Sequence, residues 1–124
     1  MAFPCMCHLS DEIKYKRVTN IELARFNKMY GNVIRINRHD YRIVWCRDLN
    51  HNGPCAGLCD VANKEIYVDV STDIEETLIH ETSHAEVFEA GFRQRNDWDM
   101  NLEEMLVETM AKGVSSAFKI RKKV

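Results

Sequence analysis

The strongest constraint on the fold of this chain is a change of hydrophobic periodicity near residue 71. Residues 65–70 read EIYVDV and place apolar side chains at every second position, which predicts a half-exposed β-strand. The next segment, STDIEETLIHETSHAEVFEA, opens with a capping box formed by Thr72 and Glu75 and predicts a helix that ends at Gly91. The centre of the chain therefore consists of a strand followed directly by a long helix.

The flanking segments predict further helices and strands. Residues 18–30 indicate a helix capped by Thr19 or Asn20, and residues 33–37 and 41–46 are rich in β-branched and aromatic side chains, which indicates a hairpin. Residues 48–60 concentrate Asn, Gly, Pro and Asp, which is typical of an irregular loop.

A last helix is expected from about residue 102 to residue 120. Its apolar face is predicted to contain Leu102, Leu106, Met110, Gly113 and Ala117. Together these elements predict an α+β fold in one domain over residues 1–124, with a small, mainly antiparallel sheet packed against helices.

The composition excludes several classes of protein. Of the 124 residues, 45% are hydrophobic and 29% are charged, as in folded globular proteins, and the net charge of −2 gives no general attraction for nucleic acid. The chain shows no apolar run of the about 20 residues that span a bilayer and no signal peptide, so we expect a cytoplasmic protein without a membrane partner. Its five cysteines are an odd number and are expected to be reduced thiols.

The segment H-E-T-S-H, residues 80–84, contains the candidate metal-binding and catalytic residues. On a helix, His80 and His84 lie four residues apart on one face, so both imidazoles can bind one zinc ion with Glu81 beside them. Zinc in a site with an open position lowers the pKa of a water from about 9 to about 7, and Glu81 would accept the proton of that water as general base. A helix with two histidines by chance is the alternative, but the position of the motif in an apolar helix after a strand favours zinc.

A catalytic zinc needs a third protein ligand, and the last helix offers Glu103, Glu104 and Glu108. We favour Glu104, which shares a helical face with apolar residues, and keep Glu103 and Glu108 as alternatives. Asn101 and Glu104 also match a capping box, which would engage the Glu104 side chain with the backbone, whereas Asp99 as the cap would leave it free.

The arrangement resembles the zincin-like metallopeptidases, in particular the small SprT-like and ImmA/IrrE-like proteins, many of which are phage-encoded. The residues that carry the resemblance are Gly57 and Asp60, then EIYVD, STDIEE and TLIHETSHA, within residues 41–118. The resemblance implies a zincin-like fold, hydrolysis of peptide bonds in a protein or peptide substrate, and a glutamate ligand at the start of the last helix. It also implies that an edge strand binds extended substrate, for which residues 65–70 are the candidate.

Other functions stay open. The same residues would serve a non-catalytic, zinc-containing binding or regulatory domain, and a DNA-associated peptidase is disfavoured because no basic patch is present. A second, structural zinc site would need thiolate ligands at spacings that match zinc ribbons poorly. The residues considered for that second site are Cys5, Cys7, His8, Cys55 and Cys59.

Overall fold

The computed structural model describes residues 12–122, with side chains described up to residue 114. In chain order the elements are β1 (Lys14–Arg17), α1 (Asn20–Tyr30), β2 (Val33–Ile36), β3 (His39–Asn50), β4 (Gly57–Asp60), β5 (Glu65–Asp69), α2 (Ile74–Glu89), the 3-10 turn η1 (Phe92–Gln94) and α3 (Met100–Lys122). The predicted α+β class is confirmed. Within the described residues, no helix is both long enough and apolar enough to cross a bilayer.

The five strands form one mixed sheet. Its order is β1-β3-β5-β4, and β2 also pairs with β3. The pairs β1/β3, β2/β3 and β4/β5 are antiparallel, whereas β3 and β5 are parallel. Strand β5 therefore lies inside the sheet, and the prediction that residues 65–70 form an edge strand is wrong. Strand β4 is at that end of the sheet instead.

The segment predicted as a loop, residues 48–60, contains regular structure at both ends. Strand β3 continues through Asn50, and residues 57–60 (GLCD) form strand β4, in which all four residues are buried. Local composition did not predict β4, because Gly and Asp are weak strand formers. Pairing with β5 and burial under α2 determine its conformation instead.

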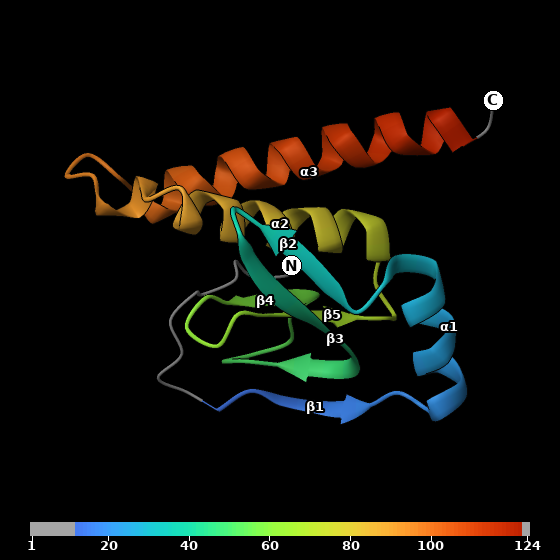
Figure 1. Cartoon of the computed structure of the whole chain (residues 1–124). Coiled ribbons are helices and arrows are strands. Elements are labelled where there is room, and N and C mark those ends of the chain that lie inside the picture. The colour runs from blue at the N-terminus through green and yellow to red at the C-terminus, as the bar shows by residue number, and fades with distance from the viewer. Residues whose placement is uncertain (1–11, 123–124) are drawn as a thin grey trace.

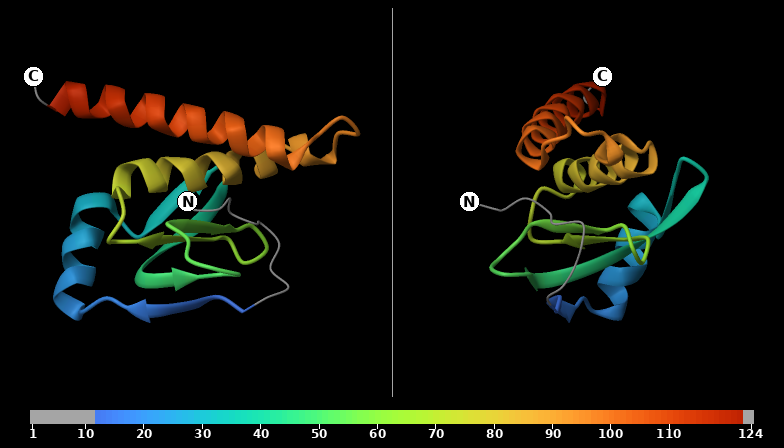
Figure 2. Two further views of the ribbon diagram at one scale, coloured as in Figure 1. Left: turned by 180° about the vertical axis from the view of Figure 1, so that it is seen from behind. Right: turned by 90° about the vertical axis from the view of Figure 1, so that its left-hand side faces the viewer.

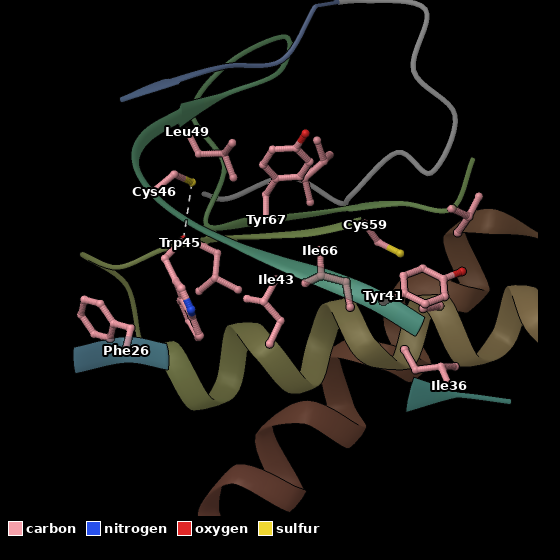
Figure 3. Close-up of a cluster of buried hydrophobic side chains, with 14 residues drawn as sticks. Phe26, Ile36, Tyr41, Ile43, Trp45, Cys46, Leu49, Cys59, Ile66 and Tyr67 are labelled. Carbon is pink, nitrogen blue, oxygen red and sulfur yellow. Dashed lines mark hydrogen bonds between the residues drawn. The ribbon is translucent and has the colours of Figure 1, made fainter. Parts of the chain in front are cut away.

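The helices α2 and α3 form two layers on one face of the sheet. In Figure 1, α2 lies directly above the strands and α3 lies above α2, and both views of Figure 2 show the same order. Ile43 and Ile66 are buried and point from the sheet toward α2 (Figure 3). Helix α1 packs beside the sheet through Phe26, whose ring stacks on Trp45 with 5.5 Å between centroids. Helix α2 therefore lies between the sheet and α3.

The opposite face of β5 is also largely buried. Tyr67 is only 8% exposed, its ring makes an edge contact with Tyr15 at 5.6 Å, and its hydroxyl donates to Glu65. Asp69 is 7% exposed and its carboxylate accepts from the backbone N–H groups of Leu49 and Ser71. The prediction of a half-exposed strand is wrong, because the polar side chains of β5 have partners within the fold.

The helix caps agree with the sequence at α1 and differ at α2. Thr19 caps α1 and forms a capping box with Glu22. At α2 the cap is Asp73, whose carboxylate accepts from the N–H of Glu76, while the predicted cap Thr72 donates its hydroxyl to the carbonyl of Asp69. Both residues favour helix starts, and the bond of Thr72 to the end of β5 leaves Asp73 as the cap.

Helix α3 packs with a different face from the predicted one. Leu102, Leu106 and Met110 are 47–55% exposed, whereas Glu103, Val107 and Ala111 are buried. The sequence pattern favoured the more apolar face because Glu103 is charged. Burial of that charge is stabilised by the hydrogen bonds that Arg93 donates to it.

The carboxylate of Glu89, at the end of α2, bonds to residues of β3 and to Lys64. Glu89 accepts a hydrogen bond from the hydroxyl of Tyr41 at 2.5 Å, forms an ion pair with Lys64, and lies 3.4 Å from Nε2 of His39. Burial opposes ionisation of Glu89, but the hydrogen bonds from Lys64 and Tyr41 lower its pKa below the ordinary 4.5.

We expect Glu89→Gln to lower the free energy of unfolding by about 2 kcal/mol at neutral pH, because the charged acceptor of these bonds is lost. A lowered folded-state pKa adds stability above pH 4.5, and that stability is lost as the pH falls through the folded-state pKa. The two proteins should therefore converge in urea unfolding below pH 4.5.

The matched control is Asp48→Asn, which breaks the exposed ion pair of Lys16 and Asp48 at 3.4 Å. It should change stability by less than about 0.5 kcal/mol. Equal effects of the two substitutions would contradict the role of Glu89.

Candidate metal centre

Helix α2 brings both histidines and Glu81 to its face toward α3 and β4. The imidazole rings of His80 and His84 have centroids 5.0 Å apart. His84 is completely buried, Glu81 is 3% exposed, and the side chain of His80 is 18% exposed. The helical spacing predicted from H-E-x-x-H thus places two imidazoles side by side.

Helix α3 adds a carboxylate to this pair. Oε1 of Glu104 lies 2.7 Å from Nε2 of His80, and Oε2 lies 2.9 Å from Nε2 of His84. One ligand atom from each of the three residues lies within 4.8 Å of the others, close enough to hold one metal ion. Two imidazole nitrogens with one carboxylate are the donor set of many catalytic zinc sites, so the residues fit zinc.

The cap of α3 explains why Glu104 is available. The carboxylate of Asp99 accepts from the N–H of Asn101 at 2.9 Å. Asp99 therefore caps the helix, and the side chain of Glu104 faces the two histidines rather than the backbone of Asn101. This is the arrangement in which Glu104 can serve as a ligand.

The alternative ligands Glu103 and Glu108 lie near the group but outside it, and Glu108 lines the same pocket as Glu104. Glu103 is 1% exposed, and its Oε2 lies 2.5 Å from Nδ1 of His84, the ring nitrogen opposite to Glu104. The side chain of Glu108 is 53% exposed and pairs with Lys112 at 3.1 Å. Among the described residues, the candidate metal group contains neither of them.

Hydrogen bonds from neighbouring side chains control the ionisation of Glu103 and Glu104. Burial alone would raise the pKa of Glu104, but its hydrogen bonds with His80 and His84 lower the pKa to about 2. Burial likewise opposes ionisation of Glu103, and hydrogen bonds from Arg93 and His84 lower its pKa to about 2. Both side chains are therefore anionic at neutral pH, as a metal ligand and its support must be.

A pocket of about 240 Å³ gives access to the group. It is lined by His80, Glu81 and Glu104, whereas the fully buried His84 does not line it. Gly57, at the start of β4, forms part of the wall. A Cβ atom at Gly57 would lie 2.6 Å from Cγ2 of Thr77 and 2.9 Å from Cγ of Glu81. Strand β4 thus approaches the site closely because residue 57 has no side chain.

We expect Gly57→Ala to destabilise the fold by about 1–3 kcal/mol and to weaken zinc binding, because the added methyl group displaces α2 or the Glu81 side chain. Gly113→Ala is the matched control, since nothing lies within 4 Å of its added Cβ. In an exposed helix interior that change should stabilise by about 0.5–1 kcal/mol. Thermal unfolding and zinc titration measure both effects, and an unaffected Gly57→Ala protein would refute the close approach of β4.

The described cysteines do not form a second site. Cys46, Cys55 and Cys59 form no disulfide bond, and burial raises the pKa of the candidate Cys55, which disfavours the thiolate that binds metals. Cys5, Cys7 and His8 lie outside the described residues.

One part of the site was not predicted. Arg93 and Trp98 both donate hydrogen bonds to Glu103, which in turn contacts His84. Neither Arg93 nor Trp98 was predicted from the sequence to belong to the site. No motif or spacing marks Arg93, because its contact with Glu103 depends on how the turn after α2 folds back.

Comparisons with protein-family models, curated proteins and solved structures return no match for this chain.

Proposed function

We propose that this protein is a zinc-dependent metallopeptidase of the zincin-like type, which hydrolyses peptide bonds with Glu81 as general base. The observation that carries the proposal is the convergence of His80, His84 and Glu104 beside the buried Glu81, at a pocket that reaches three of these four residues. A purely structural zinc site would be closed by four protein ligands. An accessible three-residue site is typical of catalysis.

The residues have separate roles. His80 and His84 would hold the ion with their Nε2 atoms, and Glu104 would hold it with a carboxylate oxygen. When bound, zinc supplies Lewis-acid chemistry, which lowers the pKa of a water to about 7 and polarises a carbonyl group. Glu81 would accept the proton of the attacking water and deliver it to the leaving amine.

The substrate is proposed to lie along β4. Among the described strands, β4 pairs only with β5, and its first residue, Gly57, lines the pocket beside Glu81. An extended peptide can add to a sheet edge through main-chain hydrogen bonds. This replaces the earlier expectation for residues 65–70, which lie inside the sheet.

The test is cleavage of unfolded, fluorescently labelled polypeptides by the zinc-loaded protein. We expect new peptide termini in mass spectrometry, loss of cleavage after chelation and recovery when zinc is restored. Tight zinc binding without cleavage of any polypeptide would instead indicate the non-catalytic binding or regulatory domain.

A further inference from the structure

We infer that Glu103 is a positioning residue that fixes the orientation and tautomer of His84, so that Nε2 of this histidine faces the metal. The inference rests on the proposed metal centre but not on its catalytic activity. It also assigns a function to Arg93 and Trp98, which hold the Glu103 carboxylate in place.

Four donor groups surround the carboxylate of Glu103. Oε1 accepts from Nε of Arg93 and from Nε1 of Trp98, both at 2.9 Å. Oε2 accepts from Nη2 of Arg93 at 2.5 Å and lies 2.5 Å from Nδ1 of His84. An ionised carboxylate has about four lone-pair positions and no proton to donate. These four contacts therefore fill the acceptor positions of the Glu103 carboxylate.

This geometry determines which nitrogen of His84 carries a proton. Because the ionised Glu103 only accepts, a hydrogen bond with Nδ1 requires the N–H group to be on His84. A neutral ring protonated at Nδ1 has its lone pair at Nε2, the nitrogen that lies 2.9 Å from Glu104. Glu103 thus selects the tautomer that can bind zinc in the candidate group.

Burial keeps water away from the contact between Glu103 and His84. His84 is 0% exposed and Glu103 is 1% exposed, so water does not replace either partner. Hydrogen bonds between buried partners of this kind orient metal-binding histidines and raise their basicity. The ring is therefore held before a metal arrives.

The four side chains come from four consecutive parts of the chain. His84 belongs to α2, Arg93 to η1, Trp98 to the connection after η1, and Glu103 to α3. The ring of Trp98 also packs on Phe92, with 5.8 Å between centroids. The turn between the two helices is thus joined to the metal site, although none of its residues belongs to the candidate group.

The direct test is nitrogen-15 NMR of histidine-labelled, zinc-loaded wild-type protein. We expect the His84 proton to couple to Nδ1, with Nε2 showing the shift of a metal-bound nitrogen. A proton on Nε2 with zinc on Nδ1 would overturn the inference. This measurement needs no variant, so it decides even where a substitution prevents folding.

The second test compares Glu103→Gln with Glu108→Gln, the same change in the same helix at a largely exposed side chain. A glutamine amide at position 103 places donor hydrogens against Arg93 and against either His84 or Trp98. In folded protein checked by circular dichroism, we expect Glu103→Gln to weaken zinc binding by about 10–100-fold and Glu108→Gln to leave it within about threefold.

The possible outcomes separate this inference from the proposed function. Equal zinc affinities of the two variants would overturn the role of Glu103, whether or not the protein cleaves peptides. A wild-type protein that binds zinc through Nε2 of His84 but cleaves nothing would support the inference and refute the peptidase. A wild-type protein that binds no zinc would refute both.

Discussion

Replacing Glu81 with glutamine should leave one zinc ion bound per chain and lower peptide hydrolysis by about 10²–10⁴-fold. The amide occupies nearly the same volume as the carboxylate, so the packing against Gly57 is kept. It cannot accept the proton of the attacking water, however, and the general base is lost. Zinc content and steady-state cleavage are measured on the same preparation.

Glu86→Gln is the control for this experiment, because Glu86 lies in the same helix with an exposed side chain outside the metal group. It should retain wild-type turnover. Unchanged cleavage by Glu81→Gln would assign the base to another residue, and simultaneous loss of zinc would show that Glu81 supports the metal rather than the proton transfer.

Replacing Glu104 with alanine should weaken zinc binding by more than about 100-fold, beyond the range expected for a residue that only supports a ligand. The substitution removes one of three ligands and leaves the two imidazoles without a carboxylate across the pocket. His84→Ala should have an effect at least as large, since it removes a ligand from the buried side of the site. Competition with a chromophoric chelator measures both affinities.

Glu108→Ala is the control, and it should keep wild-type affinity because Glu108 pairs with Lys112 at the surface. A Glu104→Ala protein with unchanged zinc affinity would contradict the ligand assignment. If its melting temperature fell equally with and without zinc, Glu104 would have a purely structural role in α3.

The parts of the fold that local pattern determines were predicted correctly. Helix α1 begins after Thr19 and ends before Gly31, and the β2–β3 hairpin lies where β-branched residues are concentrated. The positions of His80, Glu81 and His84 on one helix also follow from sequence alone, because residues in a helix keep a fixed angular spacing.

The remaining features depend on contacts between distant segments. The sequence of β4 gives only a weak strand signal, and β4 forms because it pairs with β5. The same pairing places β5 inside the sheet. Glu103 and Glu104 are adjacent in sequence, yet Glu103 contacts Nδ1 of His84 and Glu104 contacts Nε2. Their roles depend on the rotation of α3 about its axis, which is set by the burial of Val107 and Ala111 against α2.

The most direct test of the metal centre is the zinc X-ray absorption spectrum of the full chain loaded with one equivalent of zinc. The structure predicts only nitrogen and oxygen neighbours at about 2.0–2.2 Å, with the multiple-scattering signal of two imidazoles from His80 and His84. A shell of sulfur atoms at about 2.3 Å would show that cysteines hold the ion, and it would contradict a catalytic site formed by His80, His84 and Glu104.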